Sequence, residues 1–330
     1  MGAIDTTILP TAADIQAAAK RLYGVAVRTP LINSPVLDER LGARVFLKAE
    51  ILQRTGSFKF RGAYNRISSI PEGKRAAGVV AYSSGNHAQG VAAAARLMGM
   101  RATIVMPSDA PRAKRERTKA LGAEVVPYDR DKDDRAAIAK KIAVERGATI
   151  VPPYDDPFII AGQGTIGTEI VEDLARLSLK PDIVVIGASG GGLAAGTALG
   201  IKSGAASAKI YTVEPEGFDD TLRSFASGRR ESNPRQSGTI CDALMSNTPG
   251  ELTFPITQKL IGAGLTANDR EVAAAVRYAF EELKLVVEPG GAIGLAALLA
   301  GKLDVKGKVV VGVLSGANVD AELFAKLIAA

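Results

Sequence analysis

The sequence predicts an α/β fold made of two units, each an open parallel sheet flanked by helices. At 330 residues the chain is long for one hydrophobic core, so two domains are expected. From Gly78 onward, short β-branched runs alternate with alanine-rich helical segments, and a second series of the same kind begins at Gly164. Such short connections require right-handed crossovers between parallel strands. Two units of this kind are expected to share one ligand cleft.

The first part of the chain contains an amphipathic helix over residues 15–25 and a short strand over 45–48. In the first α/β series, the expected strands cover 79–82, 102–106 and 124–127. The helices between them begin near Ala88, Pro111 and Asp133, at the Gly, Pro and Asp residues that favour helix ends.

The second series opens with a helix over 164–177 and continues with strands over 182–186 and 209–213. Residues 218–253 lack a regular pattern. A helix over 271–283 follows, and the helical spacing of four apolar side chains predicts a core-facing stripe: Val272, Val276, Phe280 and Leu283. The last elements are a helix over 292–299, a strand over 309–314 and a terminal helix from Val319.

Composition excludes several classes of protein. Apolar residues make up 47% of the chain and charged residues 23%, which is typical of a globular enzyme. No apolar run approaches the roughly 20 residues that span a bilayer, and no signal pattern opens the chain, so a cytoplasmic protein is expected. The net charge of +6 includes one basic run over 112–119. With only 5% aromatic residues and no Trp, that run predicts a solvated helix that attracts anions, and no nucleic-acid partner is expected.

Two residue types that occur only once limit the catalytic mechanisms that this chain can use. Cys241 is the only cysteine, which excludes an intrachain disulfide, and its apolar neighbours predict a packed thiol. His87 is the only histidine, and no nucleophile-elbow sequence accompanies it. A Ser-His-Asp hydrolase and a histidine-rich zinc site are therefore both excluded.

The stretch Ser57-Phe58-Lys59-Phe60-Arg61-Gly62 places one lysine between two aromatic residues. An ammonium beside apolar rings loses solvation, which lowers its pKa and makes the amine available as a nucleophile or Schiff-base former. The alternative is a lysine at a helix start whose stem packs while its charge reaches water.

Three further stretches each follow a strand and open a helix or turn. Gly187-Ala188-Ser189-Gly190-Gly191-Gly192-Leu193 lets backbone amides approach a phosphate, although it is neither a Walker loop nor a good dinucleotide fingerprint. Ser83-Ser84-Gly85-Asn86-His87-Ala88-Gln89-Gly90 can hold a carboxylate at a helix N-terminus. Leu314-Ser315-Gly316-Ala317-Asn318 ends a buried strand. For each stretch, an ordinary turn or helix cap remains the alternative.

Together these four stretches resemble, in order and over nearly the whole chain, the fold type II pyridoxal-phosphate enzymes. Within that family they are most similar to the serine/threonine dehydratase and serine racemase group. The resemblance implies catalytic roles for Lys59 and Ser84. It implies cofactor binding by Phe58, Lys59, Asn86, Ser189, Gly190, Gly191, Gly192, Leu193 and Ser315. It implies substrate binding by Ser83, Ser84, Gly85, Asn86 and His87, and the irregular region adds Asp242 as a polar contact of the substrate.

The resemblance also implies an architecture. A tryptophan synthase β-like fold with two open twisted sheets is expected, in which residues 1–77 and 154–330 form a large cofactor-binding domain and 78–153 an inserted small domain. A homodimer or homotetramer is expected as well. Only residues 319–330 follow the Ser315 motif, so the regulatory domain of biosynthetic threonine deaminases, and with it feedback by isoleucine, is not expected.

The implied reaction is β-elimination from a β-hydroxy amino acid such as L-threonine or L-serine, which yields a 2-oxo acid and ammonia. Serine racemase and 3-hydroxyaspartate dehydratase remain alternatives, because Ser84 does not discriminate and the side chain of the substrate cannot be inferred. Outside this chemistry, a nicotinamide-dependent oxidoreductase lacks its glycine fingerprint here, and a non-catalytic binding protein would not require Lys59.

A divalent-cation site is a further feature of the resembled family. Glu214 and Asp220 match its carboxylate ligands, and the carbonyl of Phe218 matches a third. Two carboxylates and a carbonyl suit Mg or Ca with water completing the coordination shell. An acidic surface loop is the alternative.

Overall fold

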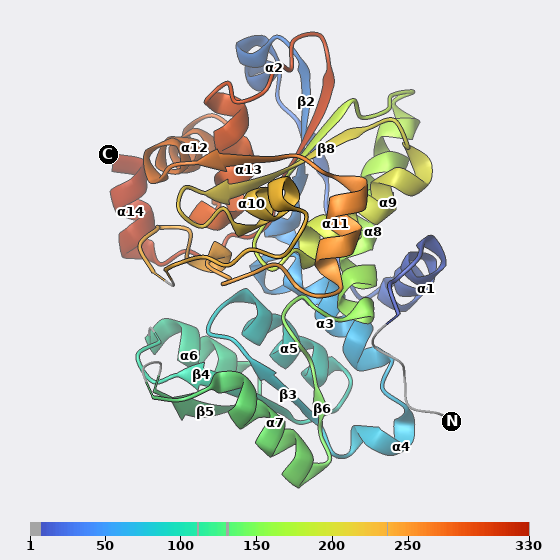
Figure 1. Ribbon diagram of the computed structural model, residues 1–330, viewed down its shortest axis with the longest axis vertical. Coiled ribbons are helices and arrows are strands. Elements are labelled where there is room, and N and C mark those ends of the chain that lie inside the picture. Colours follow the sequence, from blue (N-terminus) through green and yellow to red (C-terminus); the bar gives the residue numbers. More distant parts are fainter. Residues whose placement is uncertain (1–7, 111, 130–131, 236, 330) are drawn as a thin grey trace.

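Two separate sheets form the framework of the protein in its computed structural model, which describes residues 8–110, 112–129, 132–235 and 237–329 (Figure 1). The larger sheet has the strand order β1-β2-β10-β7-β8-β9, and the smaller has the order β5-β4-β3-β6. All pairs are parallel except β1 with β2. The predicted α/β class with two open sheets is confirmed.

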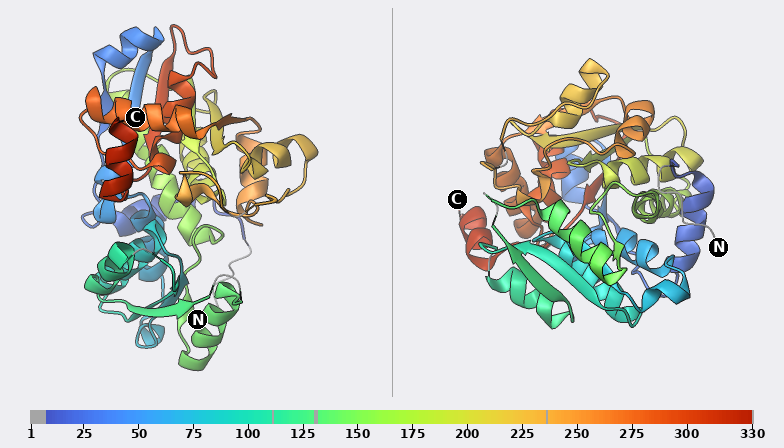
Figure 2. Two further views of the ribbon diagram at one scale, coloured as in Figure 1. Left: turned by 90° about the vertical axis from the view of Figure 1, so that its left-hand side faces the viewer. Right: turned by 60° about the horizontal axis from the view of Figure 1, so that its bottom comes forward.

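The smaller sheet comes from one continuous stretch of chain, β3 (Val79–Tyr82), β4 (Ala102–Pro107), β5 (Glu124–Tyr128) and β6 (Thr149–Ile150). Its helices are α5 (Asn86–Leu97), α6 (Arg112–Ala120) and α7 (Arg135–Arg146). In the left view of Figure 2 this unit forms the lower lobe, below the elements of the larger sheet. The stretch agrees with the expected small domain, while the boundaries at 77/78 and 153/154 stay a prediction.

The larger sheet draws strands from both ends of the chain. They are β1 (Leu31–Asn33), β2 (Arg44–Ala49), β7 (Ile183–Gly187), β8 (Lys209–Pro215), β9 (Gly264–Ala267) and β10 (Val309–Leu314). Its long helices are α8 (Pro157–Arg176), α9 (Gly192–Gly204), α12 (Asp269–Glu281) and α13 (Pro289–Leu299). The remaining helices are α1 (Ala12–Leu22), α2 (Pro35–Leu41), α3 (Lys59–Ser68), α4 (Glu72–Arg75), α10 (Asp220–Ser227), α11 (Thr253–Leu260) and α14 (Ala321–Ala329), with short 3-10 turns η1 (Glu50–Leu52), η2 (Arg54–Gly56) and η3 (Asp242–Leu244).

Three predicted elements need correction. Helix α8 begins at Pro157 rather than at residue 164, because Asp156 Oδ1 accepts hydrogen bonds from the N–H groups of Phe158 (2.8 Å) and Ile159 (3.0 Å). The stretch 218–253 is not wholly irregular, since it contains α10 and η3.

The predicted stripe on helix α12 is also partly wrong. Val272 and Val276 are fully buried, but Phe280 is 40% exposed and packs edge-on against Phe324 of α14. Leu283 lies beyond the end of the helix, at Glu281. Leu283 still packs against the core from beyond the helix end, so Phe280 is the one residue of the stripe that points away from the core.

Helix α8 packs closely against its neighbours through glycine. A Cβ added to Gly162 would lie 2.7 Å from the Cα of Gly62 in α3, and one added to Gly167 would lie 2.8 Å from the backbone nitrogen of Ile201 in α9. Such distances are too short for any side chain, so the backbones are in contact. This contact fixes α3, which carries Lys59, against the helices of the larger sheet.

A buried ion network fixes the same helix electrostatically. Arg61, 1% exposed, donates from Nε and Nη2 to Glu50 of η1 (2.8 Å each) and from Nη1 to Glu169 of α8 (2.6 Å). Lys48 of β2 donates to Glu169 as well (2.6 Å). Burial by itself raises the pKa of Glu169, but Arg61 and Lys48 outweigh burial, and its pKa lies below the ordinary value.

We predict that Glu169→Ala lowers the free energy of unfolding by about 3–5 kcal/mol at neutral pH, because buried Lys48 loses its close carboxylate and buried Arg61 keeps only Glu50. Since the folded-state pKa of Glu169 is depressed, its contribution is present above the unfolded-state pKa and is lost as the pH falls through the acid range. Urea denaturation of both proteins at several pH values measures this.

The matched control is Glu172→Ala in the same helix, where the carboxylate is half exposed and pairs with Arg28. That change is expected to cost less than about 1 kcal/mol. Equal losses of unfolding free energy in the two variants would show that the buried network stabilises the fold no more than an exposed ion pair does.

Candidate active site

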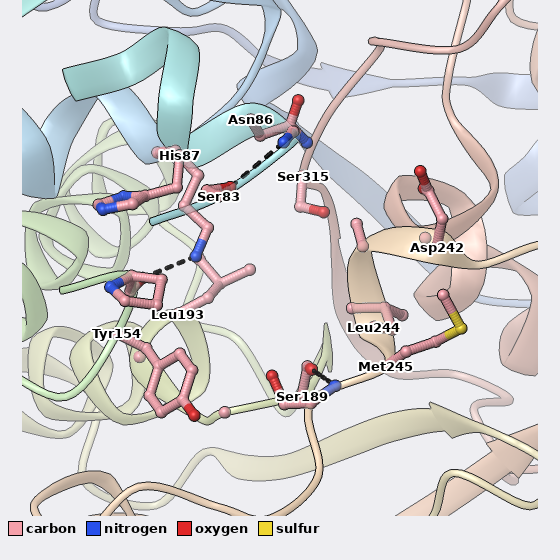
Figure 3. Close-up of a pocket in the computed structure, with 18 of the residues that line it drawn as sticks. Ser83, Asn86, His87, Tyr154, Ser189, Leu193, Asp242, Leu244, Met245 and Ser315 are labelled. Carbon is pink, nitrogen blue, oxygen red and sulfur yellow. Dashed lines mark hydrogen bonds between the residues drawn. The ribbon is translucent and has the colours of Figure 1, made fainter. Parts of the chain in front are cut away.

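A cavity of about 210 Å³ lies between the two units (Figure 3). The smaller unit contributes the loop between β3 and α5, together with Lys114 and Arg135. The larger unit contributes the loop between β7 and α9, the residues around η3, and the end of β10. The carboxyl ends of parallel strands thus meet at the cavity, where open α/β sheets place their ligands.

Lys59, the first residue of α3, lines this cavity. Its Nζ donates to the carbonyl oxygen of Pro153 (2.7 Å) and lies 5.1 Å from the centre of the Phe58 ring. Burial lowers the pKa of Lys59 to about 8, and the nearby carboxyl of Glu288 partly opposes that shift. The expected low pKa is therefore present, and an appreciable fraction of the amine is uncharged near neutral pH.

Phe60 does not take part in this environment. Its side chain is fully buried on the other side of α3, where it stacks on Tyr64 (5.7 Å between ring centres) and lies under Arg54. The expectation that Lys59 sits between two rings is thus wrong for Phe60, because consecutive helical residues point in different directions.

The loop at the N-terminus of α5 brings Ser83, Ser84, Gly85, Asn86 and His87 to the cavity wall. Ser83 Oγ accepts from the N–H of Gly85 (3.2 Å), which shapes the turn. The first N–H groups of the helix have no partner within it, so this turn suits an anionic group.

His87 is neutral in this setting. Its Nε2 lies 2.8 Å from the carbonyl oxygen of Val151, so Nε2 carries the proton and donates. Burial, and then the positive charge of Lys59, lower the pKa of His87 to about 3. His87 consequently adds no charge to the cavity.

The glycine loop lies at the other end of the cavity, where Figure 3 shows Ser189 and Tyr154. Gly191 has a φ of +91°, and a Cβ there would lie 2.7 Å from Thr253 Oγ1. A Cβ on Gly192 would lie 2.9 Å from that of Tyr154. Positions 191 and 192 are therefore restricted to glycine. The amides of the loop lie next to the N-terminus of α9, and Leu193 lies in the first turn of that helix.

Ser315 follows the last residue of β10 and is 7% exposed. Its backbone carbonyl accepts from the N–H of Phe58 (3.1 Å), and Ser57 pairs with Gly316 in an antiparallel bridge. Figure 3 shows the Ser315 side chain on the same side of the cavity as Asn86. The strand end and the start of α3 are thus held together.

Among the residues of this cavity that sequence reasoning missed are Lys114, Arg135, Pro153, Tyr154 and Glu288. Lys114 Nζ donates to Asp242 Oδ2 (2.7 Å), which joins α6 to η3 across the cavity mouth. Arg135 lies over the ring of Tyr82 (5.8 Å). The basic run was a usable signal for Lys114, whereas the other four belong to no motif.

The expected metal ligands lie apart from this cavity. Glu214 and Asp220 are both fully buried, so the alternative of a surface loop is wrong. Glu214 accepts from the N–H groups of Thr221 (3.0 Å) and Leu222 (2.9 Å). Burial, and then the charge of Asp220, raise the pKa of Glu214 to about 8, and burial raises that of Asp220 to about 7.

A cation fits the surroundings of this pair. Within the described ranges, Asp220 Oδ2 is buried without a hydrogen-bond partner, which is costly for a carboxylate. The same ranges contain no cluster of three or more His, Cys, Asp or Glu side chains suited to a metal. A cation would thus need oxygen from the intervening backbone at Phe218 and from water.

Comparison with known proteins identifies the family. Residues 23–316 match the family model described as "Pyridoxal-phosphate dependent enzyme". The chain belongs to this family. It is 46% identical over 315 residues to an L-threo-3-hydroxyaspartate ammonia-lyase of a Pseudomonas species, an alignment that covers 96% of this chain and 97% of the relative. It is 43% identical over 320 residues to an L-threonine ammonia-lyase of Thermotoga maritima (96% and 78%).

The fold agrees with this membership. The structure of maize serine racemase superposes with a TM-score of 0.91 at 34% identity and covers 97% of both chains. The protein is therefore a fold type II pyridoxal-phosphate enzyme of the β-eliminating ammonia-lyase group, related to threonine dehydratases, hydroxyaspartate ammonia-lyases and serine racemases. Among the described helices, none has the length and apolar character to cross a membrane.

The cavity fits pyridoxal phosphate, the cofactor that the family implies. The glycine loop leaves room where any Cβ would collide, and it presents helix N-terminal amides that suit a phosphate. Lys59 supplies an amine with a lowered pKa at the same cavity.

We predict that Gly191→Ala raises the dissociation constant of pyridoxal phosphate by about tenfold or more, because a strained φ and the clash with Thr253 cost about 1–3 kcal/mol at the cradle. Fluorescence titration of the apoenzyme measures it. Gly301→Ala is the matched control, because Gly301 also has a positive φ (+67°) but has no atom within 4 Å of an added Cβ. Comparable cofactor loss in both variants would remove the glycine loop from the cofactor site.

Proposed function

We propose that this protein eliminates water from a β-hydroxy amino acid to give a 2-oxo acid and ammonia, and that 3-hydroxyaspartate is its preferred substrate. The observation that carries the choice of substrate is a pair of cations, Lys114 and Arg135, which line the same cavity as Lys59. Serine and threonine have no second negative charge for these cations to bind. A β-carboxylate supplies one.

Different residues of the chain have different roles in this reaction. Bound pyridoxal phosphate supplies an electron-withdrawing ring that makes the α-proton of an amino acid acidic. Lys59 would hold the cofactor through its aldehyde, and its free amine would take the α-proton of the substrate at Nζ. The amides of residues 190–193 and the hydroxyl of Ser189 hold the phosphate, and Phe58 packs against the cofactor.

Two further residues set the electronic character of the site. With the cofactor bound, Asn86 would donate to its phenolic oxygen and Ser315 would form a hydrogen bond with its pyridine nitrogen. A hydroxyl at that position, unlike a carboxylate, would not keep the nitrogen protonated, which would favour loss of a β-hydroxyl group. The N-terminus of α5, with Ser83, Ser84 and the backbone of residues 85–87, binds the α-carboxylate of the substrate.

Arg135 is the stronger of the two cations as a substrate ligand. In the described part of the chain, no carboxylate lies within ion-pair distance of Arg135, whose guanidinium rests on Tyr82. A guanidinium offers two parallel donors to a carboxylate. The relative that is named for L-threo-3-hydroxyaspartate supports the same choice.

L-Threonine or L-serine is the second candidate substrate, and one contact favours it. Asp242 already pairs with Lys114 (2.7 Å), so the charge of one of the two proposed substrate-binding cations is balanced before a substrate enters. If that pair persists, the side of the cavity around Asp242 accepts an uncharged substrate side chain more readily.

We predict that Arg135→Ala lowers kcat/KM for 3-hydroxyaspartate by about 10- to 100-fold, the usual worth of one charged hydrogen-bonding group. For threonine and serine the change is expected to stay within about twofold, because neither has a β-carboxylate to lose. Ammonia release from a panel of hydroxy amino acids measures both, with Lys59→Ala as the inactive reference.

Arg101→Ala is the control for this panel, since Arg101 is an exposed arginine of the same unit that does not line the cavity. It should affect neither substrate. A wild-type enzyme that turns over threonine far better than 3-hydroxyaspartate, with no selective effect of Arg135→Ala, would overturn the proposed substrate.

We further propose that Glu214, Asp220 and the carbonyl of Phe218 hold a divalent cation. We predict that a chelator lowers the melting temperature, that Mg²⁺ or Ca²⁺ restores it, and that Asp220→Asn abolishes the response, because the cation relieves repulsion between two buried carboxylates. Calorimetric scans with and without chelator measure this. A wild-type melting temperature that does not respond to chelator or cation would exclude the site.

A further inference from the structure

Glu288 is a buried carboxyl group of the cavity that none of the steps above uses. It is 4% exposed and precedes α13 at the N-cap position. The residues favoured there, such as Asp or Ser, accept from the first N–H groups of the helix, but the side chain of Glu288 makes no such bond. It turns toward the cavity, so its position needs another explanation.

The side-chain partner of Glu288 is Asn86, and the backbone N–H of Asn318 also donates to Glu288. Asn86 Nδ2 donates to Glu288 Oε1 at 2.6 Å, between residues that are 202 positions apart in the sequence. On the other side, Asn318 Nδ2 donates to Asn86 Oδ1, also at 2.6 Å. The oxygen of the Asn86 amide therefore faces a donor and its nitrogen faces an acceptor, which leaves one favourable orientation for the amide.

This orientation leaves one N–H of the Asn86 side chain, which lines the cavity, for another acceptor. The amide nitrogen has two hydrogens, and Glu288 accepts only one of them. Asn86 itself lines the cavity, and Figure 3 shows it beside Ser315. The second hydrogen is thus available to an acceptor on a bound molecule.

The neighbouring backbone leaves space for this arrangement. A Cβ on Gly316 would collide with Glu288 Oε1 and lie 3.1 Å from Asn86 Nδ2, so only glycine at 316 admits the hydrogen bond. The contact also joins the two units of the fold, because Asn86 belongs to α5 of the smaller unit and Glu288 to α13 of the larger.

Several charges surround Glu288. Asp242 of η3 adds a negative charge, Lys114 of α6 opposes it, and Lys59 of α3 lies close enough to respond to it. Burial, and then Asp242, raise the pKa of Glu288 to about 8 despite the hydrogen bond from Asn86. Near neutral pH the group is mostly uncharged, a form that glutamine resembles in shape and charge.

We propose that Glu288 is a positioning residue for the cofactor: by accepting from Asn86, it holds the amide so that its free N–H meets the phenolic oxygen of pyridoxal phosphate. This rests on the proposed role of Asn86. Without Glu288 the amide rotates or loses its fixed place, and the cofactor loses a donor at the oxygen that tunes its absorption. Because Asn86 and Glu288 belong to different units, the donor is in place only when the units are closed together.

The test compares Glu288→Ala with Glu288→Gln in the holoenzyme. In Glu288→Ala, the visible absorption maximum of the bound cofactor is expected to shift, and kcat to fall at least tenfold, while KM and the melting temperature change little. Glu288→Gln keeps an acceptor for Asn86 and should keep the wild-type spectrum and a kcat within about threefold, as expected for loss of a neutral hydrogen bond at most. Glu281→Gln at the end of α12 is the surface control.

Two more variants keep the outcome decisive. Asn318→Ala removes the donor to Asn86 Oδ1 and should shift the spectrum in the same direction as Glu288→Ala. It replaces Glu288→Ala as the test if that variant does not fold. Asn86→Ala tests the role on which the inference rests. A spectral shift in Asn86→Ala with wild-type spectra in Glu288→Ala and Asn318→Ala overturns the inference alone.

Absence of a shift in Asn86→Ala overturns both the assigned role of Asn86 and the inference. Equal losses of kcat and melting temperature in Glu288→Ala and Glu288→Gln, with unshifted spectra, also overturn it, because Glu288 would then serve only packing.

Discussion

The position of the catalytic lysine depends first on one constraint, the fixed place of the first turn of α3. Arg61, two residues after Lys59, is held by Glu50 and Glu169 in a buried network that side-chain flexibility cannot relax. The close backbone contact between Gly62 and Gly162 removes the remaining freedom. The amine of Lys59 therefore stands at the cavity because its helix cannot slide or tilt, and the network is buried so that water does not weaken it.

The second requirement is that two independently built sheets meet with complementary groups. The smaller unit contributes a helix N-terminus and cations, and the larger contributes the glycine loop, Ser315 and Glu288. At the cavity the contacts between the units are polar, such as Lys114 with Asp242 and Asn86 with Glu288. Away from the cavity the units share a hydrophobic cluster, in which Phe60 and Ile67 of α3 pack with Val91 of α5. The apolar contacts hold the units together, whereas the polar contacts can be exchanged for water at small cost when a substrate enters.

Much of the fold could be predicted from local pattern, and the exceptions have physical causes. The strand predicted over 309–314 has the same bounds as β10, because a short unbroken apolar run between turn residues is typical of a buried strand. Helix α8 was predicted too short because Gly162 and Gly164 weaken a helix pattern, whereas here they permit close packing. Glu288 and Arg135 could not be found in this way, since each acts through partners distant in sequence and neither belongs to a motif.

Burial also explains why a cavity with so many ionisable groups is stable before any ligand binds. It lowers the pKa of Lys59 to about 8 and that of His87 to about 3, and it raises that of Glu288 to about 8. Each shift favours the neutral form, so His87 and Glu288 are mostly uncharged near neutral pH and Lys59 is the one group of the three that is still mostly charged. Two further cations, Lys114 and Arg135, lie at the mouth, where water reaches them. Negative charge entering with cofactor and substrate thus meets oriented dipoles inside and cations at the rim, with little repulsion to overcome.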